Sequence, residues 1–266
     1  MFRRLSDQRI LITGASSGIG RCLAEQAALA GAQVALAARS AEKLHELADH
    51  LNARGAKVLA VPADITSDDD RRHLLETVVD QFGGLDALIN NAGVASFGHF
   101  ASSSEKVLRQ IMEVNFFAPA ELMRLAVPIL LNGDKPAIVN IASMCGRRGL
   151  PAWTEYSASK FALCGLTEAL RAEFARFDID VLLVVPGLTK SDLPRHLLRN
   201  EGRMKIDFAK GMAPESVAAG VLRALQRNRG ETILGGEARW ILAVNRFLPR
   251  LVDRLLDRKV RRLYAQ

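Results

Sequence analysis

The sequence predicts an α/β fold with a doubly wound parallel sheet of about seven strands and helices on both faces. Short apolar runs alternate with longer helical patterns, and these runs are almost wholly apolar, as in strands buried on both faces. A glycine-rich turn joins the first run to the first helix. No linker or repeat interrupts this order, so we expect one domain over residues 1–266, with a core of 7–235 and an amphipathic C-terminal extension of 236–266.

The predicted strands are short, and most are followed by a stretch with helical periodicity. They are Arg9–Thr13, Gln33–Ala38, Lys57–Val61, Leu85–Asn90, Ala137–Ala142, Ile179–Val185 and Glu231–Leu234. The predicted helices are Ile19–Ala30, Ala41–Ala53, Asp68–Phe82, Ser104–Leu131, Tyr156–Phe177 and Pro214–Gln226.

Composition narrows the class of protein. A hydrophobic content of 49% and a charged content of 24% are typical of soluble globular chains. No run approaches the roughly 18 apolar residues of a membrane span, and the first residues do not form a signal peptide. The cysteines, Cys22, Cys145 and Cys164, lack metal-type spacing. We therefore expect no metal site and a reducing, cytoplasmic location.

The formal net charge of +7 is concentrated near the C-terminus. From Arg239 to Gln266 there are eight Arg or Lys residues against Asp253 and Asp257. The basic balance therefore belongs to a tail and does not indicate a nucleic-acid-binding domain.

The turn after the first strand has the pattern of a dinucleotide site. It reads Thr-Gly-Ala-Ser-Ser-Gly-Ile-Gly over Thr13–Gly20. Glycines allow a sharp turn and a close approach to a pyrophosphate, and the following helix N-terminus attracts the anion. A tight strand–helix loop without a ligand is the alternative, but the position after the first strand favours the cofactor. The candidate contacts here are Gly14, Ser16, Ser17, Gly18, Ile19 and Gly20.

The second strand ends in Ala38, Arg39 and Ser40, without the acidic residue that would accept hydrogen bonds from an adenosine ribose. Arg39 can pair with a 2′-phosphate, so we expect NADP(H) to be preferred, although NAD(H) is possible. We expect Arg39 and Ser40 both to contact the cofactor. Alternatively, Arg39 is a solvated residue at a helix start.

Two more strand ends carry candidate cofactor contacts. Asp64, followed by Ile65, is placed to reach the adenine, although a helix or turn cap is nearly as good an explanation. After the fourth strand, Asn90 is a candidate for tying the ends of the sheet together, and Gly93 permits close backbone approach to the cofactor. The cofactor contacts expected after this strand are Asn91, Ala92 and Gly93.

Ser143, Tyr156 and Lys160 are the candidate catalytic side chains. Tyr156 and Lys160 are four residues apart and share a helix face, whereas Ser143 ends the fifth strand. An ammonium beside a phenol lowers its pKa, and a serine hydroxyl stabilises developing alkoxide charge. Tyr and Lys at this spacing are also common on helix surfaces, but Ser143 and the glycine turn make that explanation less favourable.

With these motifs, the chain resembles the short-chain dehydrogenase/reductase family in its single-domain, NAD(P)-binding Rossmann form. The resemblance covers about residues 7–235 and rests on Thr13–Gly20, Asn90–Gly93, Asn115, Ser143, Tyr156–Lys160 and Pro186-Gly187. It implies that Tyr156 is the general acid or base and that Ser143 orients the carbonyl or alcohol. It also implies that Lys160 binds the nicotinamide ribose and lowers the pKa of Tyr156, and that Asn115 holds a water linking Lys160 to solvent.

The positions after Pro186 and Gly187 depart from the family pattern. Where the family usually shows Val or Ile and then Thr, this sequence has Thr189 and Ser191. We still expect all four residues to contact the cofactor.

The segment 192–211 is expected to cover the substrate. It mixes apolar residues with arginines and lysines, which suits an apolar carbonyl or alcohol with or without an acidic group, and equally suits a solvated lid with one packed face. We therefore expect an NADP(H)-dependent oxidoreductase acting on a carbonyl or CH–OH group. The alternatives are a 3-oxoacyl-thioester reductase and a non-catalytic NADP(H)-binding sensor or scaffold.

The extension is an amphipathic, basic pair of helices, with Pro249 ending one and starting the next. It can lie on an anionic membrane surface, fold back over the substrate cleft or pack on a second subunit. We expect a homo-oligomer, either a dimer or a tetramer. Apolar residues recur at three- and four-residue steps at Trp240, Ile241, Val244, Phe247, Leu248, Leu251, Val252, Leu255, Leu256, Val260, Leu263 and Tyr264.

Overall fold

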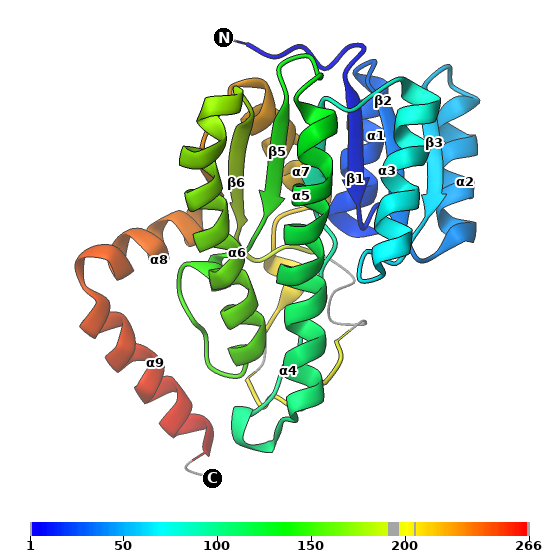
Figure 1. The fold of residues 1–266 in the computed structure, drawn as a ribbon. Coiled ribbons are helices and arrows are strands. Elements are labelled where there is room, and N and C mark those ends of the chain that lie inside the picture. The colour runs from blue at the N-terminus through cyan, green and yellow to red at the C-terminus, as the bar shows by residue number, and fades with distance from the viewer. Residues whose placement is uncertain (1, 191–196, 205, 265–266) are drawn as a thin grey trace.

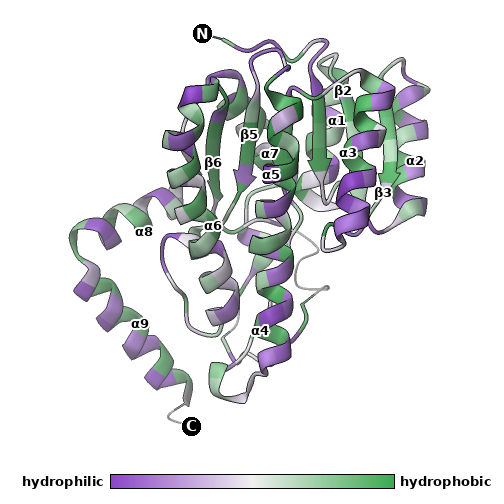
Figure 2. Cartoon of the chain, in the orientation of Figure 1, coloured by the Kyte–Doolittle hydropathy of each residue, from purple (hydrophilic) through white to green (hydrophobic). Residues whose placement is uncertain are grey.

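The computed structural model describes residues 2–190, 197–204 and 206–264. Its centre is a seven-stranded parallel sheet, as predicted, and the strand order is β3-β2-β1-β4-β5-β6-β7 (Figure 1). The strands are mostly hydrophobic (Figure 2), and the five central ones are buried between two helical layers, whereas the edge strands β3 and β7 are only partly buried. Their bounds are β1 Arg9–Thr13, β2 Gln33–Ala38, β3 Lys57–Pro62, β4 Ala87–Asn90, β5 Ala137–Ile141, β6 Asp180–Pro186 and β7 Glu231–Leu234.

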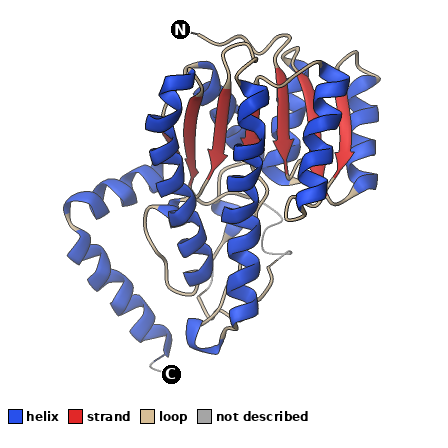
Figure 3. Cartoon of the chain, in the orientation of Figure 1, coloured by secondary structure: helices blue, strands red, loops and turns tan. Residues whose placement is uncertain are grey.

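Helices cover both faces of the sheet (Figure 3). One hydrophobic cluster joins the sheet to α1, α2 and α7, and a second joins it to α3, α5 and α6. The bounds are α1 Gly18–Leu29, α2 Ala41–Asn52, α3 Asp68–Phe82, α4 Glu105–Met112, α5 Ala118–Leu130, α6 Thr154–Glu173, α7 Pro214–Gln226, α8 Gly236–Phe247 and α9 Pro249–Tyr264.

Strand order reverses at β1, which has β2 on one side and β4 on the other. The loops that leave the carboxyl ends of β1 and β4 therefore diverge, and a crevice forms between them. Every strand of the sheet is parallel, so all these loops lie along the same edge.

One predicted element is wrong in form. The stretch Ser104–Leu131 is not a single α-helix, because a π-helical turn, Glu113–Phe117, separates α4 from α5. The wider turn directs Asn115 inward, where its side chain is fully buried and hydrogen-bonds to the backbone of Val94. Such turns inside helices are frequent at functional sites.

The C-terminal helices differ in how they pack. Ala238 and Leu242 of α8 are buried, whereas none of the α9 side chains described is buried. Helix α9 begins at Pro249, as predicted, and extends past the end of α8 away from the sheet (Figure 1). Within the described part of the chain, no helix is long and apolar enough to cross a bilayer.

At the edge of the sheet opposite the crevice, Asp86 joins three segments. Its carboxylate accepts hydrogen bonds from the backbone and side chain of Arg9 on β1, at 2.8 Å and 2.9 Å, and from the backbone N–H of Asp134, at 2.7 Å. Burial alone would raise the pKa of Asp86, but these hydrogen bonds hold it below its usual value. The carboxylate is therefore a charged anchor between β1, β4 and the turn before β5.

We expect Asp86→Asn to lower the free energy of unfolding at neutral pH by about 2–4 kcal/mol, because it leaves the partly buried Arg9 without its charged partner. Because the folded-state pKa of Asp86 is lowered, this contribution is present above the unfolded-state pKa and is lost below about pH 4. Urea unfolding across that range should show the difference from wild type shrinking in acid. Asp49→Asn, at an exposed position on α2, is the control; an equal loss there would contradict the anchor role.

Candidate active site

A cleft of about 1560 Å³ lies along the carboxyl edge of the sheet. It brings together nearly all the residues predicted for the site, since they follow different strands that end at the same edge. Gly20 and Asn115 do not line the cleft, and Ser191 lies outside the described residues. The predicted residues that line it are Gly14, Ser16, Ser17, Gly18, Ile19, Arg39, Ser40, Asp64, Ile65, Asn91, Ala92, Gly93, Ser143, Tyr156, Lys160, Pro186, Gly187 and Thr189.

The glycine turn is built for close approach. Gly14 and Gly18 have φ values of +67° and +53°, which side-chain-bearing residues rarely adopt. A Cβ on Gly20 would lie only 2.1 Å from the Gly14 carbonyl oxygen. Gly20 therefore allows α1 to start directly behind the turn. The Ser17 side chain makes no capping hydrogen bond, so the first N–H groups of α1 are available to a pyrophosphate.

Thr13 and Asn91 fix this turn against β4. The Thr13 hydroxyl accepts hydrogen bonds from the backbone N–H groups of Asn91 and Ala92, at 3.0 Å and 3.1 Å. The Asn91 amide donates to the carbonyl oxygens of Thr13 and Gly14, at 2.9 Å and 3.1 Å. Sequence reasoning treated Asn91 only as a cofactor contact and missed this structural role. Asn90, expected to tie the sheet together, donates to Asn140 on β5 at 2.8 Å.

The end of the cleft beside β2 has two cations. Arg39 is exposed and lines the cleft at the end of β2. Lys43 lines the same end one helical turn later on α2, and sequence reasoning missed it. Asp64 lines the cleft and also stabilises its own turn, because Oδ1 accepts hydrogen bonds from the N–H and hydroxyl of Thr66 at 3.0 Å and 2.8 Å. Both explanations offered for Asp64 are thus compatible with its geometry.

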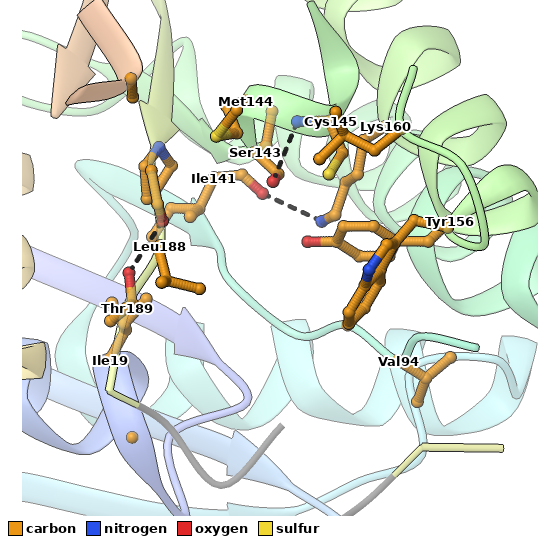
Figure 4. Close-up of a pocket in the computed structure, with 18 of the residues that line it drawn as sticks. Ile19, Val94, Ile141, Ser143, Met144, Cys145, Tyr156, Lys160, Leu188 and Thr189 are labelled. Atoms are coloured by element: carbon orange, nitrogen blue, oxygen red, sulfur yellow. Dashed lines mark hydrogen bonds between the residues drawn. The ribbon is translucent and has the colours of Figure 1, made fainter. Parts of the chain in front are cut away.

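At the other end, Tyr156 and Lys160 project from the first turns of α6 toward the end of β5 (Figure 4). The Lys160 ammonium donates to the Ile141 carbonyl at 3.1 Å and lies 5.9 Å from the centre of the Tyr156 ring. Ser143 follows β5, and its hydroxyl accepts a hydrogen bond from the Cys145 N–H at 3.2 Å. These three side chains therefore lie together although they come from two elements.

The protonation of this group is controlled mainly by burial. Burial raises the pKa of Tyr156 above its usual value, the Cys145 thiol adds to the increase, and hydrogen bonding by Ser143 opposes it. Burial lowers the pKa of Lys160 to about 8. The resemblance implies that Lys160 lowers the pKa of Tyr156, but the net change in this structure is upward because burial dominates. At neutral pH the phenol is therefore protonated and able to donate.

Asn115 lies behind Tyr156 and Lys160. Its Nδ2 donates to the Val94 carbonyl and to the Ser159 hydroxyl, both at 2.9 Å, and its Oδ1 accepts from the Val94 N–H at 2.9 Å. A Cβ on Gly93 would approach Asn115 Oδ1 to 3.2 Å and Lys160 Nζ to 3.5 Å. Gly93 thus keeps an open space between these two polar groups, which a side chain would fill.

The substrate side of the cleft is aromatic and aliphatic. Trp153 packs between Phe97 and Tyr156, with ring-centre distances of 5.1 Å and 5.7 Å. The described part of the segment 192–211 adds to this wall. This agrees with the expectation that the segment suits an apolar carbonyl or alcohol. Its apolar residues here are Leu197, Met204, Ile206 and Phe208.

Comparison with known proteins identifies the family. Residues 8–202 match the family model for short chain dehydrogenases. The chain is 34% identical over 260 residues to the uncharacterized oxidoreductase YxnA of Bacillus subtilis, which covers 96% of this chain and 73% of that protein. The chain therefore belongs to the short-chain dehydrogenase/reductase family.

Solved structures agree with this assignment. A family member from Burkholderia phymatum in complex with NAD has a TM-score of 0.85 and 26% identity, covering 94% of this chain and 96% of its own. A short-chain dehydrogenase from Sphingobium yanoikuyae in complex with NADPH has a TM-score of 0.76 and 29% identity, covering 92% and 95%. The protein is a hydride-transfer oxidoreductase that uses a nicotinamide cofactor.

We expect Lys160→Met to raise the free energy of unfolding at neutral pH by about 1–2 kcal/mol, because the gain from removing a buried charge exceeds the lost hydrogen bond to Ile141. The folded-state pKa of Lys160 lies below its unfolded value, so the destabilisation is present below about pH 8. It fades as the pH rises toward about 10.5.

Urea unfolding at neutral pH and near pH 10 measures the effect. Lys106→Met, at an exposed position on α4, is the matched control and should change little. A Lys160→Met protein less stable than wild type at neutral pH would contradict this expectation.

Proposed function

We propose that the protein is an NADP(H)-dependent reductase of apolar ketones or aldehydes and that the reaction is reversible. The observation that carries the proposal is a protonated Tyr156, with Ser143 beside it, facing an apolar wall and sharing one cleft with the glycine turn. The bound cofactor supplies hydride for the carbonyl carbon. Ser143 orients the carbonyl oxygen, and the Tyr156 hydroxyl gives it a proton, so the product is an alcohol.

Lys160 has two roles in this proposal. Its ammonium stabilises the phenolate left after proton transfer, and it contacts the nicotinamide ribose. Tyr156 regains a proton from solvent through Lys160 and a water held near Asn115. The two N–H groups of the Asn115 side chain already bind protein atoms. The water would therefore bind Oδ1 or the backbone carbonyl of this residue.

The preference for NADP(H) rests on the adenosine end. Arg39 and Lys43 supply two cations where the 2′-phosphate would lie. Similar structures contain either NAD or NADPH, so the preference depends on this chain's own residues. A cytoplasmic location is supported by the three cysteines, which are buried and free.

We expect Tyr156→Phe to reduce kcat/KM for ketone reduction by about 100- to 10,000-fold, because it removes the proton donor and leaves the ring packing intact. The assay follows NADPH oxidation with a panel of ketones and aldehydes. The binding of NADPH to the variant, followed by fluorescence, should match wild type. Unchanged turnover would overturn the role given to Tyr156.

We expect Arg39→Asp to lower the ratio of kcat/KM for NADPH over NADH by about 10- to 100-fold, since a charge-assisted hydrogen bond is replaced by repulsion. Arg54→Asp introduces the same charge change at an exposed position outside the cleft and should leave the ratio unchanged. Equal ratios in the Arg39→Asp variant and wild type would remove Arg39 from cofactor selection.

A further inference from the structure

The C-terminal helices form part of the wall of the catalytic cleft. Figure 2 shows hydrophobic and hydrophilic residues side by side along α9. The hydrophobic ones recur at helical spacing and line the same cleft as Tyr156, whereas arginines such as Arg250, Arg254 and Arg258 do not line it. The apolar lining residues of this wall are Trp240, Ile241, Val244, Leu248, Leu251, Val252, Leu255 and Leu256.

Several side chains of this apolar wall are left exposed by the described part of the chain. Trp240 is 68% exposed, and Leu255, in the middle of α9, is 54% exposed. Burial of such side chains is worth roughly 1.5–3 kcal/mol each, so an unfilled wall of this kind favours an apolar occupant. The cleft volume of about 1560 Å³ also exceeds the range of roughly 300–1,000 Å³ typical of ligand sites. A dinucleotide at the glycine turn therefore leaves room for a large substrate.

Arg148 fixes the position of the wall. It lies on the loop that follows Ser143, and its guanidinium donates to Asn245 on α8 at 3.1 Å and pairs with Asp253 on α9. Both C-terminal helices are thus tied to the segment that carries a catalytic residue. Because Arg148 forms an ion pair with Asp253, its side chain adds little net charge to this part of the cleft.

We propose that the wall formed by α8 and α9 binds the aliphatic chain of a long-chain ketone or of the corresponding alcohol, whose reacting carbon lies at Tyr156. The apolar surface is continuous, since it runs from the aromatic cluster around Trp153 and Tyr156 into α8 and α9 within one cleft. Apart from Glu237 near the start of α8 and Lys259 near the end of α9, the side chains with which these helices line the cleft are aliphatic or aromatic, which matches an alkyl chain. This inference rests on the proposed carbonyl reduction.

The test is a homologous series of methyl n-alkyl ketones from butanone to heptadecanone, assayed with NADPH. We expect kcat/KM to rise by about two- to fourfold per methylene until the chain outgrows the wall. A second measurement does not depend on turnover. The protein has two tryptophans, Trp153 and Trp240, and both line the cleft, so ketone binding can be followed by intrinsic fluorescence.

Leu255→Asp and Phe247→Asp form a matched pair of variants. Each replaces an exposed apolar side chain by a carboxylate, but Leu255 lines the cleft and Phe247, which is 77% exposed, does not. We expect Leu255→Asp to lower the ratio of kcat/KM for the longest ketone over butanone by about tenfold or more, and Phe247→Asp to leave this ratio unchanged. Leu255→Trp should shorten the ketone chain length at which kcat/KM stops rising.

The outcomes separate the two proposals. If no ketone is reduced but affinity by fluorescence still rises with chain length, the proposed function fails, whereas the assignment of the wall as a binding surface for an aliphatic chain stands. If all ketones are reduced and bound equally, the inference fails and the proposed function stands. Two results together would overturn the inference. The first is a chain-length profile that is flat, and the second is an equal effect of Leu255→Asp and Phe247→Asp on flotation with phosphatidylglycerol vesicles or on the mass of a dimer. They would assign the surface to a membrane or to a second copy of the chain.

Discussion

The hydrogen-bonded junction between β1 and β4 is the constraint on which the site depends. Thr13 and Asn91 each bond across it, so the glycine turn and the loop after β4 form one unit. The same loop continues to Gly93, which lies against Asn115 and Lys160. A displacement of this junction would therefore move the proposed pyrophosphate site and Lys160 together.

The two edges of the sheet serve different purposes. At the amino edge, the buried charge of Asp86 is fully partnered and stabilises the fold. At the carboxyl edge, the buried charge of Lys160 has one protein acceptor, the Ile141 carbonyl, among the hydrogen bonds described, and its pKa is lowered. Lys160 is thus held in a state that costs stability, which is common where a residue is kept for function.

Much of this arrangement could be predicted from the sequence, because it depends on local patterns. Apolar runs located the strands to within a few residues, and the strand ends located most of the cleft. The π-helical turn at Asn115 could not be predicted, since periodicity favours one continuous helix. The wider turn is stabilised by tertiary hydrogen bonds of Asn115 with Val94 and Ser159. Lys43 was missed because its position in the cleft depends on the angle between β2 and α2. The raised pKa of Tyr156 depends on burial, which spacing alone does not reveal.

The C-terminal extension shows why an amphipathic pattern does not by itself identify its partner. Periodicity defined the apolar face of α8 and α9, but a membrane, a second subunit and the cleft all suit such a face. The pairing of Arg148 with Asp253 adds the missing information, because it orients α9 relative to the loop that carries Ser143. With that orientation, Leu255 and its apolar neighbours line the same cleft as Tyr156. If the wall binds an aliphatic chain as proposed, its position relative to Tyr156 depends on Arg148, and loss of the Arg148–Asp253 pair should affect long substrates more than short ones.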